Sequence, residues 1–277
     1  MDKIRFGTAG IPLNMPNRNT IDAPNYIREL GLDAMELEFV HSINLTNEKA
    51  KELKKAAEDN DLKLSCHAPY FVNLCSNEPS KIAASKQRIL KSAEIANIAG
   101  AESVTFHAGY YQGKDTEKVY EKIKKEIQEI VLSLRKKGNT IKISPETTGK
   151  GSQFGSIKEL VKIAQEIKGV SLCVDFAHLY ARSIGKFNGE KDFGSTIDYI
   201  KNELGKSYIE DMHVHFSGMN YGPKGERNHL VLEDENNKFD YKGLIKAFQK
   251  YKVKGIIVSE SPNIEEDALL MQKLFMQ

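Results

Sequence analysis

Histidines and carboxylates recur in this sequence at points where short strand-like segments end. The segment KLSCHAPYF, residues 63–71, reads as a strand up to His67, after which a proline forces a turn. The same arrangement returns further along the chain at His107, Glu146 and Glu260. Neutral imidazole and carboxylate are the ligands that hold Zn²⁺, Mn²⁺ or Fe²⁺ in proteins. These residue types therefore predict metal chemistry, provided that the fold brings them together.

Further candidates follow in the second half of the sequence. Asp175 and His178 are three residues apart and reach one site if the chain turns helical there, although Asp175 also suits a helix N-cap. His213 and His215 are two apart and share one face of a strand, and we prefer His213 as the ligand. Each residue taken singly also suits a scaffold role, so the prediction of a metal site needs the whole set to converge.

Eight strand-like segments, alternating with segments of helical spacing, must position these residues. Residues 116–138 place apolar side chains at intervals of three and four, and residues 156–169 begin with a serine and a glutamate three positions later, which is a capping box. Strands that are almost continuously apolar, alternating with amphipathic helices, indicate a parallel sheet covered by helices. The strand-like segments begin at Ile4, Ala34, Leu62, Ser103, Ile141, Val170, Asp211 and Gly255.

Eight strand–helix units in about 250 residues are typical of one α/β fold, the closed (β/α)₈ or TIM barrel. No linker interrupts the chain, so we expect a single domain over residues 1–277. A doubly wound open sheet is the alternative, weakened because GTAG at residues 7–10 lacks a glycine-rich phosphate pattern. In a barrel, the third to eighth strands bring their terminal histidines and carboxylates to one rim. His229 joins them from the loop after the seventh strand, whereas His41, after the second, lies outside the set.

More ligands converge on this rim than one metal ion requires. Two or three clustered metals would use them all, with one carboxylate bridging between ions. Clustered metals suit displacement at phosphorus, because one activates water while the others stabilise the attacking and leaving oxygens. The set therefore favours phosphoester hydrolysis.

Composition describes an ordinary globular protein. The 277 residues are 28% charged and 40% hydrophobic, and the net charge of +2 gives little overall attraction for nucleic acid. No apolar run approaches the ~18–20 residues of a membrane span, and no signal peptide is evident. The three cysteines form no CxxC pair and are interpreted as reduced thiols. We expect a cytoplasmic monomer that does not bind membranes.

Six motifs of the chain resemble, in order, those of the endonuclease IV family within the xylose isomerase-like TIM barrels. The resemblance runs from the third to the eighth strand, and its most specific piece is PETTGKGSQFGS. It implies a (β/α)₈ barrel, a trinuclear zinc site and cleavage of DNA on the 5′ side of abasic sites during base excision repair. The motifs are HAPYFVNL from His67, FHAGYY from Phe106, PETTGKGSQFGS from Pro145, CVDFAHLYA from Cys173, MHVHFSG from Met212 and ESPN from Glu260.

For two of the metals the resemblance implies a shared carboxylate. His67 and His107 would hold the first zinc together with Glu146, which would bridge to the second. Glu146 and Glu260 would be the catalytic residues, with Glu260 helping to orient the attacking water. The second zinc would be completed by Asp175, His213 and Glu260.

For the third metal the resemblance implies His178 and two ligands from the segment GERNH. These would be Glu226 and either Asn228 or, with a shift of one residue, His229. The family reads Asp-Arg-His where this chain reads Glu-Arg-Asn-His, so we expect two or three ions. Zn²⁺ is the expected metal, and Mn²⁺ is the alternative.

Damaged double-stranded DNA is the partner that the resemblance implies. Tyr70 and Phe71 match loop residues that the family inserts into DNA at the lesion, although packing over the barrel rim is the simpler interpretation. Lys150, Arg182 and Lys186 could meet phosphates near the rim. The loop after the second strand has no arginine where the family carries one, which indicates a divergent, archaeal-type branch.

Related xylose isomerase-like barrels supply the competing hypothesis, a sugar isomerase or epimerase. The resemblance to those enzymes implies a single Mn²⁺ or Mg²⁺ held by Glu146, Asp175, His213 and Glu260, whose glutamates move protons beside a sugar carbonyl. That hypothesis gives no metal role to His67, His107 and His178. A barrel that binds metal without catalysis is a third class. We favour the nuclease.

Overall fold

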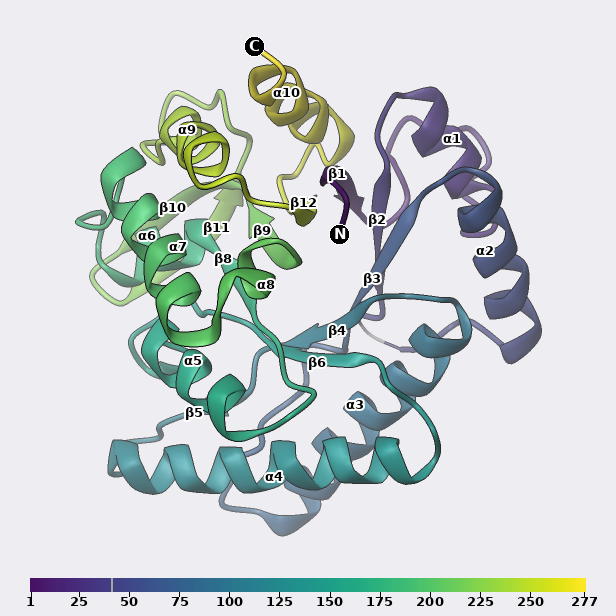
Figure 1. Cartoon of the computed structure of the whole chain (residues 1–277). Coiled ribbons are helices and arrows are strands. Elements are labelled where there is room, and N and C mark those ends of the chain that lie inside the picture. The colour runs from purple at the N-terminus through teal and green to yellow at the C-terminus, as the bar shows by residue number, and fades with distance from the viewer. Residues whose placement is uncertain (41) are drawn as a thin grey trace.

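Eight parallel strands form one sheet in the computed structural model, which describes residues 1–40 and 42–277 and so leaves His41 outside. The strand order is β6-β4-β3-β2-β1-β12-β9-β8, and bridges at Ile143–Val170 and Glu146–Cys173 bring the two edges together. The predicted TIM barrel is therefore confirmed (Figure 1). The strands are β1 (Ile4–Ala9), β2 (Ala34–Glu38), β3 (Lys63–His67), β4 (Ser103–Phe106), β6 (Lys142–Pro145), β8 (Cys173–Asp175), β9 (Met212–Phe216) and β12 (Gly255–Ser259).

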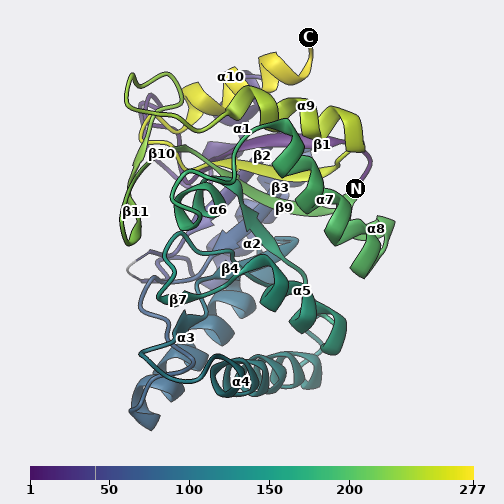
Figure 2. The same cartoon turned by 90° about the vertical axis from the view of Figure 1, so that its left-hand side faces the viewer.

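Helices surround the barrel and cover its apolar outer face (Figures 1 and 2). Their caps follow the sequence signals: the Asp115 side chain accepts from the backbone N–H of Lys118, and Ser156 and Glu159 form the predicted capping box. The helices are α1 (Ala23–Glu29), α2 (Asn47–Asp59), α3 (Pro79–Ile98), α4 (Thr116–Lys136), α5 (Ile157–Glu166), α6 (Phe176–Arg182), α7 (Glu190–Leu204), α8 (Lys206–Ile209), α9 (Tyr241–Tyr251) and α10 (Glu265–Phe275).

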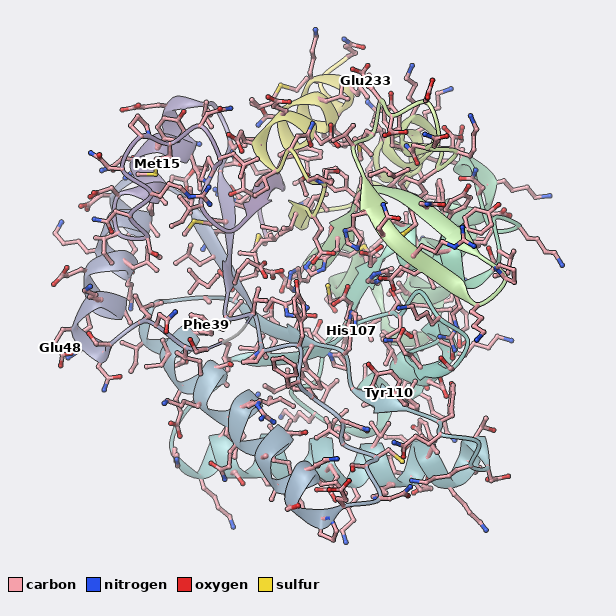
Figure 3. All side chains as sticks on the ribbon, turned by 180° about the vertical axis from the view of Figure 1, so that it is seen from behind. Met15, Phe39, Glu48, His107, Tyr110 and Glu233 are labelled. Atoms are coloured by element: carbon pink, nitrogen blue, oxygen red, sulfur yellow. The ribbon has the colours of Figure 1, made fainter. Side chains whose placement is uncertain are left out.

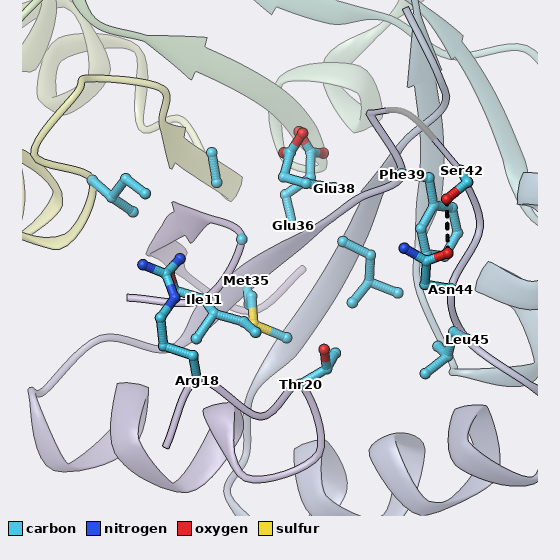
Figure 4. A pocket seen from close by; sticks show the side chains of 14 residues that line it. Ile11, Arg18, Thr20, Met35, Glu36, Glu38, Phe39, Ser42, Asn44 and Leu45 are labelled. Atoms are coloured by element: carbon cyan, nitrogen blue, oxygen red, sulfur yellow. Dashed lines mark hydrogen bonds between the residues drawn. The ribbon is translucent and has the colours of Figure 1, made fainter. Parts of the chain in front are cut away.

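Successive side chains along the strands point alternately toward the surrounding helices, where they are apolar, and into the barrel interior, where many are polar. In β2, Met35 and Leu37 are buried on the side away from Glu36 and Glu38, as the close view in Figure 4 shows for the labelled residues. The same alternation in β9 turns the histidines at the first and third positions after Met212 toward the interior, where both contact carboxylates. The interior of the barrel is therefore where titratable side chains meet.

Two antiparallel ribbons extend the wall at the carboxyl ends of the strands. The hairpin of β10 (Gly218–Gly222) and β11 (Gly225–Leu230) follows β9, and β5 (Gly109–Tyr110) pairs with β7 (Gln153–Phe154). Figure 2 shows the hairpin on the side of the molecule away from the N-terminus. Within the described residues, no helix has the length and apolar character needed to cross a membrane.

Candidate metal centre

The ends of β3, β4 and β6 bring one set of ligand atoms together. His67 Nε2 and His107 Nε2 lie 3.3 Å and 3.2 Å from the same Glu146 oxygen, Oε2. The Nδ1 atom of His67 is 2.6 Å from the carbonyl oxygen of Ala68. Because a carbonyl can only accept, Nδ1 carries a proton, and Nε2 is the nitrogen that can bind a metal ion. His107 lies in the middle of the barrel mouth in Figure 3.

A second set surrounds the other oxygen of Glu146. His215 Nδ1 is 3.2 Å from Glu146 Oε1 and 3.3 Å from Glu260 Oε1. Ligand atoms of Glu146, Asp175, His215 and Glu260 all lie within 4.8 Å of one another. Glu146 therefore faces two sets at once, one with each oxygen.

His215, and not the preferred His213, occupies this second set. His213 lies deeper in the barrel, with Nε2 2.8 Å from Glu36 Oε2 and Nδ1 3.0 Å from the Ser103 hydroxyl. Two residues of a strand span roughly 7 Å, so only the later histidine of the pair reaches the rim. The structure therefore brings His215, rather than the preferred His213, to Glu146, Asp175 and Glu260.

A third set lies where the β10–β11 hairpin meets α6. Ligand atoms of His178, Glu226 and His229 lie within 4.8 Å of one another, and His178 Nε2 is 3.6 Å from Glu226 Oε2. His178 Nδ1 is 2.9 Å from the Thr147 carbonyl, and His229 Nδ1 is 3.1 Å from the Glu260 carbonyl. Both rings are thus held so that Nε2 is free to bind a ligand.

The hairpin geometry decides between the two residues left open for this third set. Asn228 is exposed and pairs with Asn220, whose side-chain amide donates to its Oδ1. A bulge after Asn220 shifts the register of the ribbon, and His229 is the residue that reaches His178 and Glu226.

A glycine allows the hairpin to approach the loop after β6. A Cβ atom at Gly149 would lie 2.6 Å from the Cβ of Glu226, and the Glu226 backbone N–H donates to the Gly149 carbonyl at 3.0 Å. Any larger residue at this position would displace Glu226 from the third set.

Asp175 is placed for both roles that the sequence allowed, a helix N-cap and a metal ligand. Its Oδ1 caps α6 by accepting from the His178 backbone N–H at 2.6 Å. Its Oδ2 is buried and, among the described residues, has no hydrogen-bond partner. The start of α6 at this point is the helical turn that brings Asp175 and His178 to one rim.

The electrostatics of these sets suit cations. Glu146 is 1% exposed, and its Oε2 finds no hydrogen-bond partner in the described part of the chain. Burial works against ionisation, but the nearby His107 and His215 hold the pKa of Glu146 well below its usual range. Burial raises the pKa of Glu260 to about 7. Buried carboxylates without hydrogen-bond donors, facing imidazole nitrogens, form a donor set that fits Zn²⁺, Mn²⁺ or Fe²⁺.

Sequence reasoning missed two carboxylates on β2. Glu36 is fully buried and contacts both histidines of β9, and burial raises the pKa of Glu38 to about 7. Residues 34–39, AMELEF, indicated that both glutamates face the same side, since two residues that are two apart in a strand share one face.

Two further predictions concern residues around the rim, the aromatic pair Tyr70 and Phe71 and the basic residue Arg182. Tyr70 and Phe71 stand exposed after β3, with the Tyr70 ring centroid 5.3 Å from that of His67. Arg182 is not free to meet a phosphate through the nitrogen that faces the loop. Its Nη1 donates to the carbonyls of Lys150 and Gln153 at 2.6 and 3.0 Å and so holds the loop after β6.

A cavity of about 310 Å³ opens between the ends of β1 and β2 and the loops that follow them (Figure 4). Its lining is largely apolar, with Arg18, Thr20 and Asn44 among the polar residues. Glu36 and Glu38 also contribute to its wall. This volume is within the range of small-molecule sites.

Comparisons with known proteins agree with this architecture. The family described as xylose isomerase-like TIM barrel matches residues 24–274. An uncharacterized protein of Methanocaldococcus jannaschii is 40% identical over 270 residues, covering 98% of this chain and 96% of that protein. A protein named probable endonuclease 4, from Acholeplasma laidlawii, is 25% identical over 231 residues, or 82% of this chain and 69% of the relative.

Two solved structures share the fold at low sequence identity. Endonuclease IV from Thermus thermophilus superposes with a TM-score of 0.70 at 20% identity, over 97% of both chains. A D-tagatose 3-epimerase-like protein superposes with a TM-score of 0.71 at 19% identity, over 97% of this chain and 96% of the other.

Proposed function

The chain belongs to the xylose isomerase-like TIM barrel family, and on this basis we propose that it is a metal-dependent phosphodiesterase that hydrolyses DNA on the 5′ side of abasic sites. The resemblance of its motifs to endonuclease IV is confirmed by the relative named probable endonuclease 4. One observation carries the proposal: three sets of ligand atoms lie next to one another, with Glu146 a member of two of them and His178 of the third set 3.2 Å from its Oε1. A sugar isomerase needs only one of these sets.

In this proposal each set holds one divalent metal ion, with zinc expected. When bound, clustered metals neutralise the charge that develops on a phosphate and activate water for attack. The first ion would be held by His67, His107 and Glu146; the second by Glu146, Asp175, His215 and Glu260; the third by His178, Glu226 and His229.

The protein's own contribution is to orient the ligands before substrate arrives. Carbonyl groups fix His67, His178 and His229 through Nδ1, so that Nε2 of each ring is available. Glu146 is held rigidly because each of its oxygens faces a different set of imidazoles. Glu260 lies beside both Glu146 and His215 at the mouth, and in this proposal it orients the attacking water molecule.

Recognition of DNA would begin at the loop after β3. Tyr70 is 55% and Phe71 is 64% exposed, and the two stand next to each other in the chain after His67 of the first set. Aromatic side chains of this kind can stack on unpaired bases or enter a base step. In this proposal they contact the duplex at the lesion.

A cleavage assay tests the proposal directly. Zinc-loaded protein would be incubated with a duplex carrying one tetrahydrofuran abasic analogue, which cannot undergo β-elimination. The expected product is a nick on the 5′ side of the analogue, and chelation should abolish it. Intact DNA after incubation with protein that holds two or three zinc ions would rule out this substrate and point to another phosphoester.

A metal-dependent sugar isomerase or epimerase is the second candidate. The set of Glu146, Asp175, His215 and Glu260 is already complete for a single ion, and β2 ends in the half-buried carboxylate of Glu38 rather than in a basic residue. Protein that binds one Mn²⁺, leaves the duplex intact and exchanges a sugar carbon-bound proton with deuterated water would establish this alternative.

A further inference from the structure

We propose that Glu36 is a positioning residue of the metal centre, which holds the His215 ring so that its Nδ1 atom faces the second set. The inference rests on the proposed metal-binding role of the second set, and it concerns a residue outside that set. Glu36 stands on β2, and β1 and β12 lie between β2 and β9 in the sheet. Its side chain therefore crosses the barrel interior to reach the opposite wall.

The two oxygens of Glu36 contact one histidine each. Oε1 lies 2.7 Å from His215 Nε2, and Oε2 lies 2.8 Å from His213 Nε2. The other nitrogen of the same ring, His215 Nδ1, lies 3.2 Å from Glu146 Oε1 and 3.3 Å from Glu260 Oε1, in the second set. With a cation bound in that set, Nδ1 would give its lone pair to the metal and the proton would be on Nε2, where the Glu36 carboxylate can accept it.

The far side of this arrangement is anchored as well. His213 Nδ1 is 3.0 Å from the Ser103 hydroxyl on β4, so the ring of His213 is held between β2 and β4. Glu36 is fully buried, and its two oxygens face the rings of the two histidines. A buried carboxylate is unfavourable unless it is paired, which ties the side chain of Glu36 to these two rings.

Glu36 differs from the groups that orient the other candidate ligands. His67, His178 and His229 are each oriented by a backbone carbonyl, whereas His215 is oriented by a carboxylate. A carboxylate partner makes an imidazole a more basic ligand, and loss of such a partner typically weakens metal binding by about 10- to 100-fold. The effect should be confined to the second set, because that set alone contains His215 among the three proposed to hold metal.

The histidines of β9 could also take part in a different metal site. Cys173, His213 and His215 also place ligand atoms within 4.8 Å of one another, deeper in the barrel. We assign Cys173 and His213 to scaffold roles, and His215 to the second set through Nδ1, because the Nε2 atoms of both rings already face Glu36. A metal ion bound there would contradict the assignment.

Metal binding by Glu36→Gln tests the proposal, with Glu233→Gln, the same chemical change at an exposed position, as the control. Metal-free protein would be titrated with Co²⁺ in competition with a chelator, and bound metal would be counted by elemental analysis. We expect Glu36→Gln to weaken one site by about 10- to 100-fold, to alter its Co²⁺ absorption and to leave the other sites unchanged. Glu233→Gln should retain wild-type affinities.

Three outcomes would overturn the proposal. The first is that Glu36→Gln binds metal with wild-type affinity. The second is that Glu36→Gln weakens every site equally and also lowers the melting temperature of the metal-free protein, and the third is that the ion lost in Glu36→Gln is also lost in Cys173→Ser. Wild-type protein that binds no metal would remove the proposal together with the proposed function. If Glu36→Gln weakens metal binding at one site as expected but the wild-type protein does not cleave the abasic duplex, the role of Glu36 stands and only the nuclease is rejected.

A measurement on the wild-type protein covers the case in which Glu36→Gln does not fold. Ring ¹⁵N shifts of the zinc-loaded protein report which nitrogen of each histidine is protonated and which is free to bind metal. We expect the proton on Nε2 in His215 and on Nδ1 in His67, His178 and His229. A proton on Nδ1 of His215 would contradict the positioning role of Glu36.

Discussion

The Glu146 carboxylate and the His215 imidazole meet at the centre of the barrel mouth, with Oε1 3.2 Å from Nδ1. The other oxygen of Glu146 faces His67 and His107, so this one side chain joins two sets of ligands. Replacing Glu146 therefore disturbs both sets, whereas replacing a histidine disturbs one. This difference separates a shared carboxylate from an ordinary ligand.

Glu146→Gln should reduce cleavage of the abasic duplex by about 1,000-fold or more, because a neutral amide cannot bridge two cations. The protein should also lose two of its bound metals while its circular dichroism is unchanged. Glu233→Gln, the same chemical change at an exposed position, is the control. Full activity in Glu146→Gln would exclude Glu146 from the reaction.

His229→Ala should remove one metal ion and most of the activity, since His229 completes the third set with His178 and Glu226. The neighbouring Asn228→Ala should change neither, because Asn228 is exposed and pairs across the hairpin. Metal content and cleavage rate measured on both variants decide the question. If Asn228→Ala loses the ion and His229→Ala keeps it, the assignment of His229 to the third set is wrong.

Alanine at both Tyr70 and Phe71 should weaken binding to the abasic duplex without changing metal content. Stacking of one base on an aromatic side chain contributes about 1–3 kcal/mol, so the double variant should bind roughly 10-fold more weakly or worse. Leu132→Ala, which removes an exposed apolar side chain from α4, is the control. Equal binding by the double variant and the wild type would restrict these aromatics to packing over the rim.

The fold and most of the candidate site followed from local patterns in the sequence. Almost continuously apolar strands alternating with amphipathic helices predicted the barrel, and a barrel necessarily gathers strand ends such as His67, His107 and Glu146. The choice between His213 and His215 could not be made from the sequence, because both share one face and differ only in depth along the barrel. That depth depends on where β9 ends relative to its neighbours, which is a property of the whole sheet.

Glu36 and Arg182 show a second limit of sequence reasoning. Glu36 contacts histidines about 180 residues away in the chain, across strands that separate β2 from β9, so local spacing could not reveal the pairing. A basic residue near a predicted rim suggested phosphate binding for Arg182, but the carbonyls of a single loop occupy its Nη1. Long-range contacts of this kind arise only once the chain has closed into the barrel.

The ion pair between Arg5 and Asp61 should stop contributing to stability at acidic pH. It lies at the end of the barrel opposite to the candidate metal sites, with Arg5 Nη2 3.1 Å from Asp61 Oδ1. The hydrogen bond from Arg5 lowers the pKa of Asp61 below its ordinary value. A lowered folded-state pKa stabilises the fold above the unfolded value, near 4, and this stabilisation disappears as pH falls through the folded value. Because Asp61 is largely exposed, we expect less than about 1 kcal/mol.

The comparison of Asp61→Asn with wild type across pH measures this contribution. Urea unfolding should give a lower stability for Asp61→Asn at pH 7, and the difference should shrink as the pH falls below 4. Asp59→Asn, which removes an exposed carboxylate of α2, corrects for the change in net charge. A difference that stays constant from pH 7 to pH 3 would show that ionisation of Asp61 is not its source.

Arg182→Met should destabilise the protein and weaken the third metal set at the same time. The guanidinium holds the loop after β6 by donating from Nη1 to the Thr148 hydroxyl at 2.9 Å and to the carbonyl of Lys150 at 2.6 Å. Loss of these charged hydrogen bonds should cost about 2–4 kcal/mol in the free energy of unfolding. The same loop carries the Gly149 carbonyl that accepts from the Glu226 backbone N–H, so a loosened loop also frees Glu226.

Lys186→Met is the control for Arg182→Met, because it removes one positive charge from an exposed position close in sequence. Urea unfolding of the metal-free proteins and Co²⁺ titration of the third set provide the two readouts. The structure predicts that both change in Arg182→Met and neither changes in Lys186→Met. If Arg182→Met kept wild-type stability but bound DNA more weakly, Arg182 would act on phosphate after all, and the loop after β6 would be held by its other contacts.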